Sequence, residues 1–354
     1  MNPQYQQLGQ PSLQQSTLSP LGSGIETIQP RVQYYHENEM FQRLVEFERL
    51  SFSPSNYGLN TGWPEIDSAL EGIQPGFHLI AGNSNMGKTS FLSQLEMQII
   101  LNNPDVYLIS FSLDDPYEEK ICRLIACSEK VPINAVKNPN KYSHMPEAIK
   151  RRNQGMYRLL NNINTIAIYD DAGSYSVIER LIEKVDQTRI DFATNLNHKR
   201  IVLCIDNFHD LDTNSPKIGK GSDAGAKFDY LAQYIADAAK QMRIPIICTA
   251  EFRKLNSYKR PNIYDIRETI KIQYEAKSIM LCYNEVSMRG EAADVFYKDA
   301  NRPAKQPIFE AHFAKNKYSS FKGRHFFYFR PDMAYFQPVT QQDREHFTKM
   351  ISSL

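Results

Sequence analysis

The chain has 354 residues, of which 42% are hydrophobic, so it is long enough for one large or two modest domains whose core needs no disulfide or metal. Its formal net charge of +1 excludes a globally basic protein, and any nucleic-acid contact must come from local charge. The five cysteines show no C-x-x-C spacing, which indicates reduced core residues of a cytosolic protein. No apolar run approaches the ~18 residues of a membrane span, and no signal-peptide pattern opens the chain, so no membrane partner is expected.

Residues 1–33 are rich in Gln, Ser, Pro and Gly. They hold too little apolar area to offset chain ordering, so we expect a disordered tail. Residues 34–57 are predicted to form a helix, over 37–50, followed by a linker. The apolar stripe of this helix comprises Met40, Phe41, Leu44, Phe47 and Leu50. The stripe can pack on its own domain or on a neighbouring subunit, and its pattern leaves both alternatives open.

Residues 58–354 are predicted to form one domain in which strands and helices alternate. Strands are expected at residues 77–81, 106–111, 165–169, 201–205, 244–250 and 278–283. Helices are expected at residues 88–101, 116–127, 145–161, 175–188 and 228–241. Apolar strands separated by helices indicate an α/β fold with a buried, mostly parallel sheet. Residues 308–315, 324–329 and 334–338 read instead as an appended antiparallel hairpin or meander.

The segment Gly-Asn-Ser-Asn-Met-Gly-Lys-Thr, residues 82–89, matches the phosphate-binding pattern G-x-x-x-x-G-K-[ST] between a predicted strand and a predicted helix. Its backbone N–H groups and the helix N-terminus suit the phosphates of ATP. Lys88 supplies a positive charge to the β- and γ-phosphates, and Thr89 offers a hydroxyl to Mg²⁺. The residues expected to hold the nucleotide are Gly82, Asn83, Ser84, Asn85, Met86, Gly87, Lys88, Thr89 and Ser90.

A carboxylate is also needed to hold Mg²⁺, largely through water. Asp206 ends the apolar run 201–205, where an acid at the carboxyl end of a strand can reach the metal. Apolar runs that end in Asp are common, so this prediction depends on its pairing with the phosphate loop.

Several segments in this order resemble the motor domain of the DnaB family of replicative helicases. They are residues 61–76, Asn85-Met-Gly-Lys-Thr89, Phe111-Ser-Leu-Asp-Asp115, Asp206-Asn-Phe-His-Asp-Leu211, residues 260–268 and Ala314-Lys-Asn-Lys317. The resemblance covers roughly residues 58–340. It implies a RecA-like fold of the P-loop NTPase class, with the C-terminal hairpin appended to the parallel sheet.

The resemblance also implies a function. Members of this family are ATP-dependent DNA helicases that form homo-hexameric rings and translocate 5′ to 3′ on single-stranded DNA during replication. It implies a primase or helicase loader as protein partner, and the cytoplasm of a bacterial or phage-infected cell as location. The ~57 residues before the motor domain are too few for the usual N-terminal domain, which indicates a phage or other mobile element. The predicted helix at 37–50 resembles the family's linker helix, which favours docking on an adjacent subunit.

The resemblance places Asp114 where the family usually has a Glu that acts as the catalytic base. Asp is shorter by one carbon, roughly 1.5 Å of reach. Asp115 is the second candidate, although we expect it to cap the helix that opens at Pro116. Glu251 stands where the family has a sensor Gln, and it would repel phosphate unless it pairs with Arg253 or Lys254.

Lys317 stands where the family has an arginine that reaches a neighbour's nucleotide, and Lys315 precedes it by two residues. On a strand both side chains would share one face, so both are predicted contacts in trans; a solvated basic face is the alternative. The Gly-rich loop 215–227 is predicted to contact single-stranded DNA through Lys217 and Lys220. A solvated loop is the alternative there.

The departures at Asp114, Glu251 and Lys317 keep a second function open. The chain can instead be a RecA-like DNA-binding ATPase that acts as a switch, loader or recombinase with slow hydrolysis. The predicted linker helix favours the helicase, because a ring needs a clamp between its subunits.

Overall fold

The computed structural model describes residues 39–52, 58–171, 175–194, 199–218, 224–253, 259–267 and 270–352. The chain divides into two compact units, Met1–Phe52 and Ser53–Leu354. In the first unit, helix α1 (Glu39–Ser51) confirms the predicted helix over the part that is described. Its apolar side chains Met40, Leu44 and Phe47 are 64%, 54% and 66% exposed. The predicted tail, the linker at 53–57 and the Leu50 side chain lie outside the described residues.

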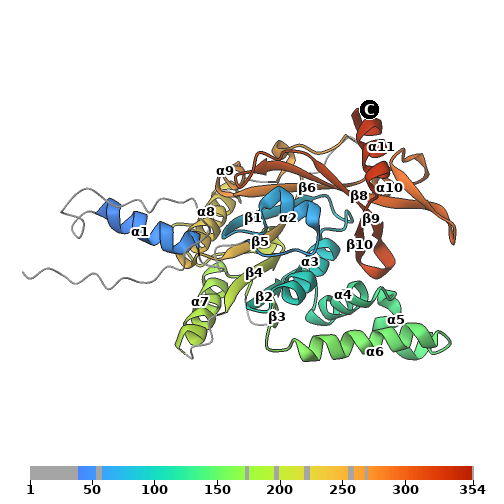
Figure 1. Ribbon diagram of the computed structural model, residues 1–354, viewed down its shortest axis with the longest axis horizontal. Helices are drawn as coiled ribbons and strands as arrows, with labels where there is room; N and C mark the ends of the chain where they lie inside the picture. The colour runs from blue at the N-terminus through green and yellow to red at the C-terminus, as the bar shows by residue number, and fades with distance from the viewer. Residues whose placement is uncertain are drawn as a thin grey trace, which may run out of the picture. The chain divides into compact units, whose positions relative to one another are not determined.

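The second unit is built on a sheet with the strand order β10-β9-β8-β6-β1-β5-β4-β2-β3, with β7 paired to β8 (Figure 1). The strands are β1 (Gly76–Gly82), β2 (Val106–Ser112), β3 (Ile166–Asp170), β4 (Arg200–Asp206), β5 (Pro245–Glu251), β6 (Ser278–Asn284), β7 (Phe296–Asp299), β8 (Arg302–Asn316), β9 (Arg324–Arg330) and β10 (Tyr335–Pro338). The neighbouring strands β3, β2, β4, β5, β1 and β6 run parallel to one another. The strands β7, β8, β9 and β10 form antiparallel pairs. The predicted parallel sheet and the appended meander are both confirmed.

Helices cover both faces of this sheet. They are α2 (Pro64–Leu70), α3 (Lys88–Asn102), α4 (Tyr117–Glu129), α5 (Ile133–Lys137), α6 (Pro146–Asn161), α7 (Ile178–Thr194), α8 (Ala224–Met242), α9 (Lys271–Glu275), α10 (Glu285–Arg289) and α11 (Gln341–Ser352). One apolar core joins α2, α3 and α4 to the sheet, and a second joins α7, α8 and α9 to its other face. The five predicted helices are confirmed with small shifts at their ends, whereas β7 and the helices α2, α5, α9, α10 and α11 were not predicted.

The parallel strands bring distant segments to one edge of the sheet. Gly82 at the end of β1 lies beside Glu251 at the end of β5, and Ser112 of β2 lies beside Asp206 of β4. Asn284 ends β6, which pairs with β1 on its other side. Because parallel strands open their carboxyl ends at the same edge, the polar side chains of several strands meet there.

The five cysteines are free, and four of them are buried, as the prediction of reduced core residues requires. Among the helices that the structure describes, none is both long and apolar enough for a bilayer crossing.

Candidate nucleotide-binding and catalytic site

The phosphate loop joins β1 to α3 and is shaped by backbone that only a small residue tolerates. Gly87 has φ +97°, and a Cβ atom there would lie 3.0 Å from the Phe329 ring of β9. Lys88 is 8% exposed, and its Nζ donates to the carbonyl oxygen of Asn83 at 2.9 Å. Ser287 of α10 donates its hydroxyl to the carbonyl oxygen of Asn85 at 3.1 Å. The loop therefore folds around its lysine, with backbone N–H groups at the start of α3 as the anion site.

A cleft of about 600 Å³ opens over this loop. It is lined by most of the predicted nucleotide residues, namely Ser84, Asn85, Gly87, Lys88, Thr89 and Ser90, together with Asp114 and Asp206. Gly82, Asn83 and Met86 do not line it; Met86 is buried in the core below. The size suits a nucleotide, since ligand pockets are typically about 300–1,000 Å³.

Thr89 and Asp206 lie on the same cleft and provide the oxygen donors that Mg²⁺ prefers. Asp206 is 3% exposed, and its Oδ1 accepts the hydroxyl of Thr249 on β5. The carbonyl oxygen of Asp206 accepts the backbone N–H of Leu113 at 2.6 Å, which holds the end of β2 against the end of β4. This donor set fits the metal predicted from the sequence.

Asp114 lies in an acid-rich part of the cleft. Partial burial, and then the negative charges of Asp115 and Asp206, raise the pKa of the Asp114 carboxyl above its ordinary value. A base whose pKa moves toward neutrality accepts a proton more readily in the transition state.

The prediction that Asp115 caps the following helix is wrong. The N-cap residue of α4 is Pro116, and it makes no side-chain cap hydrogen bond. Asp115 instead forms an ion pair with Arg123 of α4, with Oδ2 and Nη1 2.9 Å apart. The full charge of the guanidinium attracts the carboxylate more strongly than the partial charge of a backbone N–H does.

The rotation of α4 that turns Arg123 toward the cleft is set by a buried ion pair. Lys120 of α4 and Glu96 of α3 are both fully buried, with Nζ and Oε2 2.7 Å apart. The hydroxyl of Ser110 on β2 donates to the same carboxylate at 2.8 Å. Arg123 lines the cleft but was missed from the sequence, because only this long-range pair identifies the face that α4 presents.

Glu251 has a partner that the sequence did not indicate. Its carboxylate lies 3.9 Å from the guanidinium of Arg267, and its backbone N–H donates to Nδ1 of His209 at 3.1 Å. Lys254 lies outside the described residues, and Arg253 is exposed. Among the described residues, the cation beside Glu251 is therefore Arg267 and not the expected Arg253.

Asp210 is a second acidic group that the sequence reading missed. Partial burial, and then the charges of Asp114 and Glu251, raise the pKa of the Asp210 carboxyl to about 6. It lies in η4 (Phe208–Asp210), directly after β4. Its signal in the sequence was only its position four residues after Asp206.

Lys315 and Lys317 lie at the opposite edge of the sheet from the cleft. Asn316 pairs with Ser278 at the amino end of β6, whereas the carboxyl end of β6 is at the cleft. Lys315 donates to the carbonyl oxygens of Gln273 (2.5 Å) and Tyr274 (2.8 Å) at the end of α9. Burial, and then Lys317, lower the pKa of Lys315 to about 8.

The premise that both lysines share one strand face is wrong. Strand β8 ends at Asn316, so the exposed Lys317 lies in the bend that follows it. Neither side chain lines the cleft of its own chain.

The predicted DNA loop is described only in part. Lys217 is exposed, and its backbone N–H donates to Oγ of Ser215 at 3.4 Å. Lys220 lies outside the described residues. Both stay predictions.

Comparison with known proteins agrees with this geometry. The "Probable replicative DNA helicase" of Trieres chinensis is 23% identical over 248 residues, 69% of this chain and 51% of that protein. The "Replicative DNA helicase DnaB" of Buchnera aphidicola subsp. Schizaphis graminum is 23% identical over 284 residues, 75% of this chain and 57% of that protein. The chain thus spans about half the length of these curated relatives.

Two solved structures share the fold. One, an isolated ATPase domain, superposes with a TM-score of 0.70 at 19% identity, covering 86% of this chain and 99% of that one. A DnaB-like replicative helicase, described with its interactions with primase, superposes with a TM-score of 0.68 at 20% identity. The match covers 84% of this chain and 67% of that one. The predicted RecA-like fold is therefore confirmed. Residues 58–337 match the family model "DnaB-like helicase C terminal domain", and the chain belongs to that family.

Proposed function

We propose that this chain is an ATP-driven DNA helicase that works as a homo-hexameric ring and translocates 5′ to 3′ on single-stranded DNA during replication. One observation carries the proposal. The cleft of one copy is lined by the phosphate loop, Asp206 and Asp114, while Lys317 lies at the far edge of the same sheet. The seven residues of β6 that separate the two edges span about 20 Å.

A head-to-tail arrangement of copies would complete the site. A heterologous interface, which closes into a ring, can place Lys317 of one copy at the cleft of the next. The exposed apolar stripe of α1 supports the same arrangement, because it offers a clamp for an adjacent subunit.

Each residue of the proposed site has a defined task. Lys88 and the loop N–H groups bind the phosphates, and Thr89 and Asp206 hold the metal. A Mg²⁺ ion held there would supply positive charge to the phosphates. Asp114 orients the attacking water and accepts its proton. Lys317 of the neighbour neutralises developing charge, without the bidentate geometry of an arginine.

The second candidate is a RecA-like DNA-binding ATPase that acts as a switch, loader or recombinase with slow hydrolysis. The acids of the cleft favour it, because the negative charges of Asp114 and Glu251 repel the phosphates of a bound nucleotide and can slow its hydrolysis. We place the helicase first because α1 gives the chain a segment suited to clamping a ring.

A primase or a helicase loader is the protein partner that we propose. The support is the structural likeness to a helicase described together with primase.

Unwinding of a forked duplex tests the proposal. We expect ATP turnover that single-stranded DNA stimulates, and strand separation on forks that carry a 5′ tail but not on forks with only a 3′ tail. Lys88→Ala is the control without phosphate binding, and we expect it to abolish turnover. DNA-stimulated turnover without any unwinding would favour the switch instead.

Mixing two inactive variants tests the shared site. Lys88→Ala and Lys317→Ala damage opposite edges of the chain, so each alone is expected to be nearly inactive. In randomly mixed rings, roughly one interface in four joins an intact Lys88 to an intact Lys317. Recovery of turnover on mixing supports a site built by two copies; no recovery in rings shown to be mixed contradicts it.

A further inference from the structure

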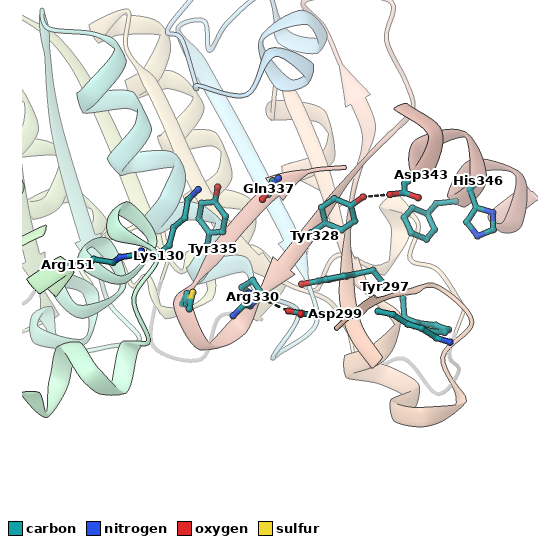
Figure 2. A pocket seen from close by; sticks show the side chains of 14 residues that line it. Lys130, Arg151, Tyr297, Asp299, Tyr328, Arg330, Tyr335, Gln337, Asp343 and His346 are labelled. Atoms are coloured by element: carbon teal, nitrogen blue, oxygen red, sulfur yellow. Dashed lines mark hydrogen bonds and ion pairs between the residues drawn. The ribbon is translucent and has the colours of Figure 1, made fainter. Parts of the chain in front are cut away.

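A second cleft, of about 690 Å³, lies on the other side of the β9–β10 hairpin (Figure 2). Phe329 and Phe336 point from these strands toward Gly87 of the phosphate loop. Tyr328 and Tyr335 are on alternate positions and line the second cleft. No lining residue is common to the two clefts, so the hairpin is a wall between separate sites.

The far wall of this tyrosine cleft is made by the helices that follow β2. Lys130, directly after α4, holds its ammonium 4.7 Å from the centre of the Tyr335 ring. Arg151 of α6 lies beyond it, as Figure 2 shows. Lys298 of β7 and Arg330 of β9 add positive charge from the strand side.

The acidic side chains of the cleft are already engaged. Asp343 of α11 accepts the hydroxyl of Tyr328, and Asp299 lies 3.7 Å from Arg330. Two of the four cations are also engaged: Arg330 lies 3.5 Å from Asp332, and Arg151 lies 3.2 Å from Glu147. Lys130 and Lys298 are the cations of the lining with no ion pair among the described residues, and they favour an anion over a cation there.

The rings are held in place before any ligand arrives. The Tyr297 hydroxyl donates to the carbonyl oxygen of Phe329 at 3.4 Å. Its ring meets Tyr328 edge to face, with centroids 5.0 Å apart. Fixed rings lose little freedom on binding, which favours a planar aromatic ligand.

We propose that the tyrosine cleft binds a nucleotide, either free or as part of a single strand. Aromatic rings stack on any base regardless of sequence, and Lys and Arg side chains bind its phosphate. The base would lie against Tyr335 and its neighbours, and the phosphate would be held by Lys298 and Lys130. The volume accommodates such a ligand.

The test measures binding with saturating ADP and Mg²⁺ in the phosphate loop. AMP, followed by calorimetry, stands for a free nucleotide. Fluorescein-labelled dT6, in a background with Lys217 and Lys220 changed to Ala, stands for a strand. We expect Tyr335→Ala to weaken binding about tenfold through the lost stacking, and Tyr335→Phe to leave it unchanged.

A charge variant protects the test from a folding defect. Lys298 is exposed, so Lys298→Glu leaves the fold intact and is expected to weaken binding by a similar factor. Lys349→Glu, on exposed α11 surface outside the cleft, is the matched control and should bind as the parent does.

The outcomes separate the sources. If the cleft variants weaken the binding of AMP only, the natural ligand is a free nucleotide. If they weaken the binding of dT6 only, the natural ligand is a single strand. The proposal is overturned if both ligands bind and no cleft variant changes their affinity. It is also overturned if a poly-glutamate peptide competes equally well, because the cleft would then recognise negative charge alone. Failure here leaves the proposed helicase function untouched, since no residue of this cleft lines the phosphate site.

Discussion

Asp114 and Asp115 are adjacent in the sequence, but their side chains have different surroundings. Asp115 is held by Arg123, whereas Asp114 lies among other carboxylates that raise its pKa. A carboxylate paired with a guanidinium is held in place and is less available to an attacking water. This difference favours Asp114 as the catalytic base.

Asp114→Asn is therefore expected to lower kcat for ATP by about 100-fold or more, as the loss of a general base does. Asp115→Asn should lower kcat by less than about tenfold, because it removes a contact to Arg123 and leaves the base in place. Steady-state ATP turnover measures both. The pH profile of kcat/KM should lose its acidic limb in Asp114→Asn only, and the reverse order of effects would assign the base to Asp115.

Asp210 gives the protein without nucleotide a pH-dependent stability. Its pKa in the folded chain is about 6, above the ordinary 3.8, so the folded state binds more protons between these values. The free energy of unfolding should fall as pH rises from about 4 to 6. Denaturant unfolding across this range measures the slope, and Asp210→Asn should flatten it. A slope identical in the variant would assign it to other groups.

At the scale of elements, the segment from Arg260 to Arg267 links two walls of the phosphate cleft. Arg260 donates to Glu310 of β8 and to Glu285 of α10, both 1% exposed. The carbonyl oxygen of Arg267 lies 3.5 Å from Nε2 of His209. Since α10 also holds the phosphate loop through Ser287, a change in this segment can reach both the loop and η4.

Arg260→Met is expected to destabilise the fold by about 3 kcal/mol, because buried Glu310 loses its nearest guanidinium and buried Glu285 keeps Arg289 but loses its second cation. Urea unfolding measures the loss. Arg189→Met is the matched control: Arg189 pairs with Asp186 on exposed α7 surface, where removal should cost less than about 1 kcal/mol. Equal losses in both variants would mean that the buried network adds no more than a surface pair.

The loop 215–227 is predicted to contact single-stranded DNA. Its basic residues offer charge without aromatic rings, so its contacts with single-stranded DNA should be electrostatic. Changing both Lys217 and Lys220 to Ala should reduce the slope of log affinity against log salt by about 1.4, from roughly 0.7 per lost phosphate contact. Fluorescence anisotropy at several salt concentrations measures it, and an unchanged slope would place the DNA site elsewhere.

At the scale of the whole molecule, the proposed site is divided between copies, and α1 is the segment expected to hold those copies together. Deleting residues 1–51 should reduce the assembly to smaller species, since the exposed stripe is removed. Deleting only residues 1–36, which leaves α1, is the matched control and should keep the ring. Light scattering gives the mass of each, and a hexamer without α1 would contradict this role.

Contiguous patterns in the chain were enough to predict the phosphate loop, the six parallel strands and Asp206. The loop has a fixed spacing, the buried strands are apolar runs, and the acid stands at the end of one run. The order of segments was enough to predict the family. The short elements α2, α5, α9 and α10 escaped prediction, because helices of five to seven residues show too little periodicity.

Which side chains meet became visible only in the folded chain. Arg123 reaches Asp115 because the buried pair of Lys120 and Glu96 fixes the rotation of α4. Lys315 binds the end of α9 because β8 runs antiparallel to β6 and brings them together. The tyrosine cleft gathers residues from 130 to 347. A spacing in the sequence sets local geometry, whereas such contacts depend on how rigid elements pack, which no local pattern encodes.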